Sequence, residues 1–80
     1  MKIKVLAFGF AADVIGERNF TLELPQATST DELQHLLEEK YHRLKDVLAY
    51  SIAVNQSYIS SSVLLKENDE VAIIPPVSGG

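Results

Sequence analysis

The chain has 80 residues, enough for one domain, and its 46% apolar and 22% charged residues are typical of a folded chain. A net charge of −4 without any basic run excludes the electrostatic pattern of a nucleic-acid-binding protein. No stretch reaches the about 18–20 apolar residues that a membrane span requires. The absence of cysteine excludes thiol chemistry and favours a reducing compartment, so we expect a cytoplasmic protein.

Two segments near the start alternate with the period of two residues that is typical of β-strands. The first runs from Met1 to Phe8 and the second from Asn19 to Leu24. Between them, Phe10 to Ile15 fits a short helical turn with Gly16 as its C-cap. The connection is too long for a tight hairpin, so we expect an antiparallel pair of strands with a helical insert.

The main helix is predicted to begin at a capping box, with Ser29 as N-cap and Glu32 reaching back to it. The apolar residues that follow at helical spacing are Leu33, Leu36, Leu37 and Tyr41. They form one stripe, so this helix should lie on one face of a sheet. Leu44, Val47 and Leu48 continue in a second short helical turn or a loop.

Three further strands are predicted in the second half of the chain: Ser51 to Asn55, a minimal strand at Tyr58-Ile59, and Val71 to Ile74. The resulting order is strand, strand, helix, strand, short strand, strand. An α+β fold follows, and with the first and last strands adjacent and parallel it becomes a β-grasp roll. The pattern alone is compatible with other α+β arrangements too.

The chain divides into a folded domain, residues 1–76, and a flexible C-terminal tail, residues 77–80. Pro75 and Pro76 cannot donate to a strand ladder and favour an extended chain. Gly79 and Gly80 have no Cβ, so the end of the tail is narrow and can enter a tight channel of another protein.

The terminal carboxylate suggests a sulfur-transfer chemistry. A carboxylate is a poor electrophile, but adenylation converts it into an acyl-AMP, and sulfur delivered to that carbonyl yields a thiocarboxylate. In a chain without cysteine, the carboxylate of Gly80 is the only group that could hold such a sulfur. The alternative is a frayed terminus that ends in glycine by chance.

The whole chain resembles the small subunit of molybdopterin synthase, most closely in its last dozen residues. The matching segments are Lys4-Val5-Leu6-Ala7-Phe8, Val14-Ile15-Gly16, Ala53-Val54-Asn55-Gln56 and Asp69-Glu70-Val71-Ala72-Ile73-Ile74-Pro75-Pro76-Val77-Ser78-Gly79-Gly80. Asn68 stands where that family usually has glycine, and asparagine also tolerates a left-handed turn.

The resemblance implies a ubiquitin-like β-grasp of about five strands with one main helix on one face. It implies a non-catalytic subunit that binds no cofactor; ATP is used by an activating enzyme that adenylates Gly80. The thiocarboxylate then gives sulfur to cyclic pyranopterin monophosphate in a heterotetramer of two large and two small subunits. Val77, Ser78 and Gly79 would lie in a channel of the large subunit.

A partner-binding surface is predicted beside the tail. Parallel pairing of the first and last strands places Leu6, Phe8 and Ile74 opposite the helix, next to Pro75 and Pro76. The helix should instead cover Ile3, Val5, Ala7, Val71 and Ile73. The outward cluster would bind the large subunit, unless a loop folds over it.

No metal site is predicted. His35 and His42 lie seven residues apart, which is about 10.5 Å along one helix and too far for one metal ion. We interpret both as solvated surface residues.

Three other functions remain open. The chain could be the sulfur carrier of thiazole synthesis, although Pro-Pro-Val before Ser-Gly-Gly and the greater length argue against it. It could also be a ubiquitin-like modifier that forms isopeptide bonds with lysines, or a non-covalent interaction domain with an inert terminus.

Overall fold

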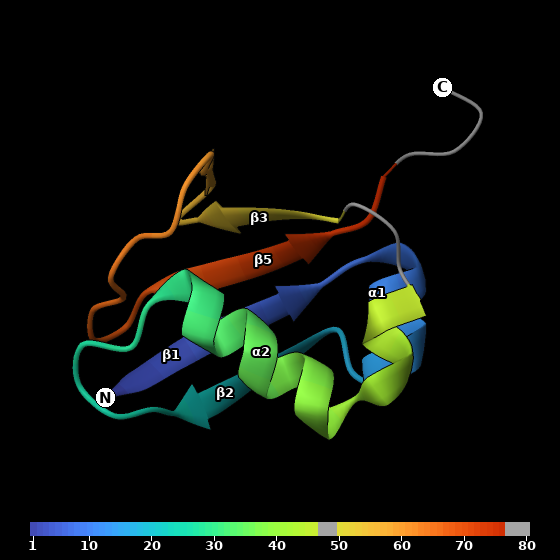
Figure 1. Cartoon of the computed structure of the whole chain (residues 1–80), viewed down its shortest axis with the longest axis horizontal. Helices are drawn as coiled ribbons and strands as arrows, with labels where there is room; N and C mark the ends of the chain where they lie inside the picture. The colour runs from blue at the N-terminus through green and yellow to red at the C-terminus, as the bar shows by residue number, and fades with distance from the viewer. Residues whose placement is uncertain (47–49, 77–80) are drawn as a thin grey trace.

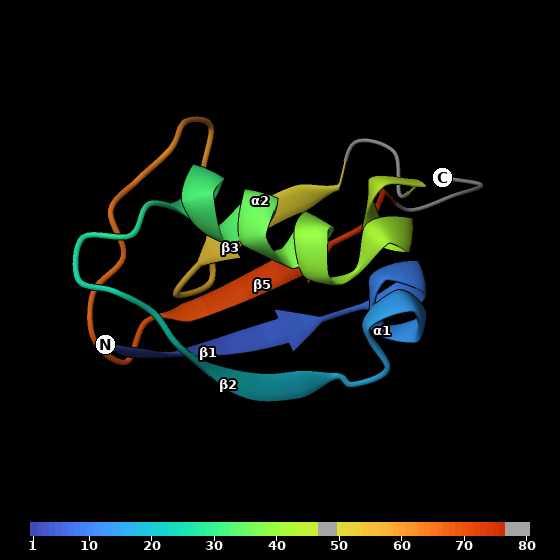
Figure 2. The same ribbon diagram turned by 60° about the horizontal axis from the view of Figure 1, so that its bottom comes forward.

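The computed structural model describes residues 1–46 and 50–76, and it contains one five-stranded mixed sheet with the strand order β2-β1-β5-β3-β4. The strands are β1 (Lys2–Ala7), β2 (Asn19–Glu23), β3 (Ser51–Val54), β4 (Ser57–Tyr58) and β5 (Glu70–Ile74). The helices are α1 (Gly9–Ile15), α2 (Thr30–Lys40) and the short 3-10 helix η1 (His42–Asp46). Figures 1 and 2 show α2 lying across the sheet, so the predicted α+β architecture is confirmed.

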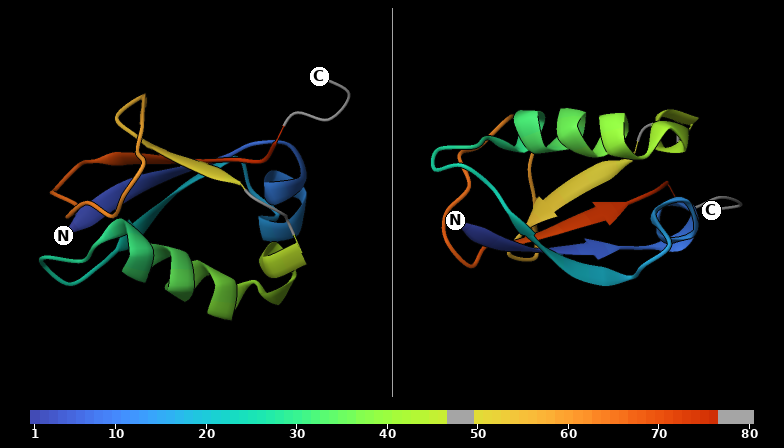
Figure 3. Two further views of the ribbon diagram at one scale, coloured as in Figure 1. Left: turned by 45° about the horizontal axis from the view of Figure 1, so that its top comes forward. Right: turned by 90° about the horizontal axis from the view of Figure 1, so that it is seen from below.

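The centre of the sheet is the parallel pair β1 and β5, with Val5 opposite Val71 and Ala7 opposite Ile73. The pairing continues one residue past β1, because the Phe8 amide donates to the Ile73 carbonyl at 3.2 Å. The two strands therefore finish side by side, at the end of the sheet occupied by α1 (Figure 3).

The core lies between the sheet and α2. Ile3, Val5 and Ala7 of β1 and Val71 and Ile73 of β5 are at most 3% exposed, which confirms the predicted inner face of both strands. Fully burying an aliphatic side chain of this kind contributes about 1.5–3 kcal/mol to folding. The helical residues packed against them include Leu33, Leu37 and Leu44.

The predicted stripe of α2 is wrong at one position, because Leu36 is 40% exposed. Leu33 and Leu37 face the core, and Leu36 lies about 60° around the helix axis from Leu33 on the side away from Leu37. The capping box is confirmed: the Glu32 amide donates to Ser29 Oγ at 3.2 Å, and the Ser29 amide donates to Glu32 Oε1 at 3.0 Å.

The β3–β4 hairpin begins its second strand one residue earlier than predicted. Asn55 and Gln56 both have positive φ, 51° and 72°, so these two residues alone close the turn and β4 starts at Ser57. Asn55 also bonds the turn before β5, since its Nδ2 donates to Asp69 Oδ1 at 2.9 Å. In that turn Asn68 has a φ of 68°, a left-handed conformation that asparagine tolerates.

Tyr50 connects the start of β3 to α2. Its hydroxyl donates to Glu38 Oε2 at 2.5 Å. Burial and, to a smaller extent, the Glu38 carboxylate raise the pKa of Tyr50 above its ordinary value of about 10. The folded state therefore favours the neutral phenol.

This shift predicts a loss of stability at alkaline pH. Above about pH 10 the unfolded chain releases the Tyr50 proton while the folded chain keeps it, so the free energy of unfolding should fall as the pH rises further. Tyr50→Phe should remove that part of the decline in urea unfolding curves. Tyr58→Phe, at a position 69% exposed, is the matched control and should leave the decline in place. An unchanged decline in Tyr50→Phe would contradict the assignment.

Candidate functional site

The candidate site lies where β1 and β5 end. β5 ends at Ile74, Pro75 follows half-buried, and Pro76 is exposed (Figure 1). Val77, Ser78, Gly79 and Gly80, which the sequence predicts as a flexible tail, lie outside the described residues. The structure therefore describes the two residues from which the tail extends, Pro75 and Pro76, which we call the tail root. They lie at the same end of the sheet as the last residues of β1.

The three residues expected beside this root do face away from α2. Phe8 is 48% exposed, whereas Leu6 and Ile74 are half-buried. Leu6 is paired with Ala72, which precedes Ile74 by two residues on the same face of β5. The predicted outward orientation of Leu6, Phe8 and Ile74 is thus confirmed.

The apolar outer face extends further across the sheet than the sequence indicated, although Ala53 and Ala72 on this face are only 4% and 8% exposed. Ala72 is paired with Ala53, and Ala53 with Tyr58, so all three share the outer face with Leu6. The following six residues lie on this face, and we call them the outer-face patch: Leu6, Phe8, Ala53, Tyr58, Ala72 and Ile74. Alternation within β3 marks Ala53 as outward, but only the register adds it and Tyr58 to this surface.

The tail root lies against the junction of β1 and α1. Gly9, the first residue of α1, has a φ of +52°, a conformation that favours glycine. A Cβ placed there would lie 3.8 Å from Pro75 Cγ, which is van der Waals contact. The chain thus turns sharply after Phe8, and the turn passes next to Pro75.

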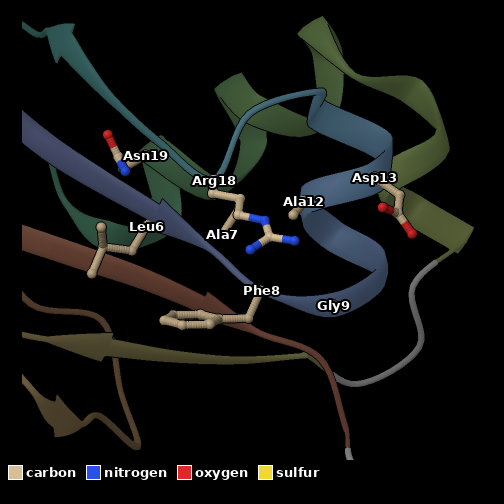
Figure 4. Close-up of a pocket in the computed structure, with 8 residues that line it drawn as sticks. All are labelled: Leu6, Ala7, Phe8, Gly9, Ala12, Asp13, Arg18 and Asn19. Carbon is tan, nitrogen blue, oxygen red and sulfur yellow. The ribbon is translucent and has the colours of Figure 1, made fainter.

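An open depression of about 610 Å³ adjoins the patch on its α1 side (Figure 4). Its lining residues are Leu6, Ala7, Phe8, Gly9, Ala12, Asp13, Arg18 and Asn19. Sequence reasoning did not single out Arg18. No local pattern could have done so, because the chain reversal after α1 is what carries Arg18 back to the end of β1.

The described residues contain no group of three or more His, Asp or Glu side chains that could hold a metal ion. The two histidines do not lie on one helix as expected, because α2 ends at Lys40 and His42 belongs to η1. Both side chains are exposed. Within residues 1–46 and 50–76, no helix is long and apolar enough to cross a membrane.

The chain is similar to known proteins over its full length. The model of the ThiS family matches residues 5–80. The molybdopterin synthase sulfur carrier subunit of Dictyostelium discoideum is 41% identical, with 99% of this chain and 96% of that protein covered.

Two solved structures are also similar. One comes from the complex of subunits 1 and 2 of the molybdopterin-converting factor of Helicobacter pylori, with 31% identity, a TM-score of 0.71 and both chains covered completely. The other is the small archaeal modifier protein 1 of Methanosarcina acetivorans, with 26% identity, a TM-score of 0.81 and coverage of 99% of this chain and 96% of that chain.

The β-grasp topology, the apolar outer face beside the tail root and the full-length similarity agree with one another. The chain therefore belongs to the ThiS family and, within it, to the molybdopterin synthase sulfur carrier subunits.

Proposed function

We propose that this chain carries sulfur as a thiocarboxylate on Gly80 and donates it to cyclic pyranopterin monophosphate within molybdopterin synthase. The observation that carries the proposal is the root of the tail. Pro75 leaves the sheet next to Gly9, the residue that follows the half-exposed Phe8, so a partner bound to the outer face would also receive the residues that follow Pro76.

The proposed chemistry takes place on the terminal carboxylate. One carboxylate oxygen attacks the α-phosphorus of ATP in a separate activating enzyme, and pyrophosphate leaves. Hydrosulfide, HS⁻, supplied by a partner then adds to the acyl-AMP carbonyl and displaces AMP, which leaves –COSH on Gly80. Gly79 and Gly80 carry no side chain that could obstruct either step. We propose that this chain binds neither ATP nor a cofactor and is itself non-catalytic.

The proposed main partner is the large subunit of molybdopterin synthase. The similar Helicobacter pylori protein was solved as a complex of subunits 1 and 2, which supports a two-subunit assembly. Leu6, Phe8 and Ile74 would bind the large subunit, and Pro75 and Pro76 would continue that contact. Val77, Ser78 and Gly79 would lie in its channel. A cytoplasmic heterotetramer with two copies of each subunit completes the proposal.

A second candidate function is protein modification through isopeptide bonds, which the similarity to a small archaeal modifier protein favours. The two functions share an activated Gly80 and differ in what attacks it. In the carrier a sulfur nucleophile attacks, whereas in the modifier the amine of a target lysine does.

One prediction of this proposal concerns the sulfur. After incubation with ATP, a sulfur source and the activating enzyme of the same organism, intact mass spectrometry should find a species heavier by the exchange of one oxygen for sulfur. Fragmentation should place the change on Gly80. A variant lacking Gly80 is the matched control and should take up no sulfur at that end. Sulfur on any other residue would falsify the proposal, and Gly80 linked to lysine amines instead would favour the modifier.

Another prediction of this proposal concerns the outer face. Phe8→Ala should weaken binding to the large subunit by more than about tenfold, because an aromatic anchor typically contributes about 2 kcal/mol or more. Its melting temperature should change little, since the ring is 48% exposed. Isothermal titration calorimetry and thermal unfolding measure the two effects.

The control for Phe8→Ala is Ile3→Ala, on the inner face of the same strand. Ile3 is 1% exposed, so this change should cost about 2–5 kcal/mol of folding free energy. If Phe8→Ala unfolds the protein and the remaining folded fraction binds normally, the outer-face assignment is wrong.

A further inference from the structure

The depression beside α1 contains a charged group that the proposed sulfur chemistry does not use. Figure 4 shows the Arg18 side chain directed toward the space between Phe8 and Ala12. Leu6 and Phe8 belong both to the depression and to the outer-face patch, so the two surfaces are continuous. A partner that covers the patch therefore reaches Arg18 as well.

Backbone contacts hold Arg18 in this place. α1 ends at Gly16, which has a φ of +89° and whose amide donates to the Ala12 carbonyl at 2.8 Å. The chain then reverses, and the Arg18 carbonyl accepts a hydrogen bond from the Ala7 amide at 2.9 Å. Asn19 follows as the partner of Leu6 in the β1–β2 ladder. These hydrogen bonds hold the Arg18 backbone opposite Ala7, the residue before Phe8.

The guanidinium has no acidic partner among the described residues. The one ion pair within 4.0 Å there joins the Met1 amino group to Glu23. Asp13 lines the same depression, yet it forms no ion pair with Arg18. Arg18 therefore presents an exposed positive charge in a chain whose net charge is −4, where most surface charge would repel an acidic partner.

The guanidinium of Arg18 favours a carboxylate as its ligand. A guanidinium offers a planar fork of N–H donors that matches the two oxygens of a carboxylate. Here the fork is directed into a depression that Phe8 and Ala12 also line. We infer that Arg18 binds the carboxylate of an Asp or Glu side chain of the large subunit, next to the apolar contact made by Phe8. This inference rests on the proposed function, which supplies the partner.

The experiment compares dissociation constants for the large subunit at low and at high salt. Arg18→Glu should weaken binding about tenfold or more at low salt, because it places two like charges together. Arg18→Met, which keeps the length but not the charge, should weaken binding less and should reduce the dependence of binding on salt. Thermal unfolding should show both variants folded, since Arg18 is exposed.

Lys66→Glu is the matched control. Lys66 is exposed and lies in the turn before β5, whereas Phe8 and Pro75 lie at the other end of β5. It makes a charge reversal of the same size and should leave the affinity nearly unchanged. The inference is overturned if Arg18→Glu binds like the unaltered chain, or if Lys66→Glu loses as much affinity. It is also overturned if Arg18→Glu impairs only adenylation by the activating enzyme. If the unaltered chain itself does not bind the large subunit, the proposed function fails first and the inference fails with it.

Discussion

The parallel pairing of β1 with β5 is the constraint on which the rest of the site depends. Parallel strands finish at the same edge of a sheet, so the outward residues at the end of β1 lie beside the residues that leave β5. An antiparallel pair would have placed Phe8 at the far end of β5 from Pro75. The single fact that residue 7 pairs with residue 73 therefore brings a binding surface and the root of the tail together.

The two faces of the sheet have different roles: the inner face packs in the core, and the outer face is available to a partner. The inner face, with Val5 and Val71 fully buried, holds the sheet against α2. The outer face keeps Phe8 about half exposed and adds Tyr58, which is 69% exposed. Because the core does not use these outer side chains, they are free to contact another protein at little cost in stability. The folded domain thus provides the binding surface, and the proposed chemistry is confined to the residues beyond Pro76.

The sequence predicted those features that depend on local pattern. Period-two alternation assigned Ile3 and Phe8 to opposite faces, and the capping box located the start of α2. Leu36 was assigned wrongly because the position of the sheet decides which side of α2 is buried. The first residue of β4 was assigned wrongly because Asn55 and Gln56 both adopt positive φ and close the turn without Ser57. Arg18, Ala53 and Tyr58 were missed because they join the site only through strand register and chain reversal. The role of Gly80 came from chemistry and resemblance, and it stays a prediction.

In the proposed function, this chain delivers sulfur from its tail and the large subunit performs the catalysis. The most direct measurement is a single turnover in which the purified thiocarboxylate form is mixed with the large subunit and cyclic pyranopterin monophosphate, without ATP or activating enzyme. The mass of Gly80 should return to that of the carboxylate at the rate at which sulfur appears in the pterin product. A product that gains sulfur while the thiocarboxylate stays intact, or a thiocarboxylate that persists in the complex with no product formed, would contradict the proposed function.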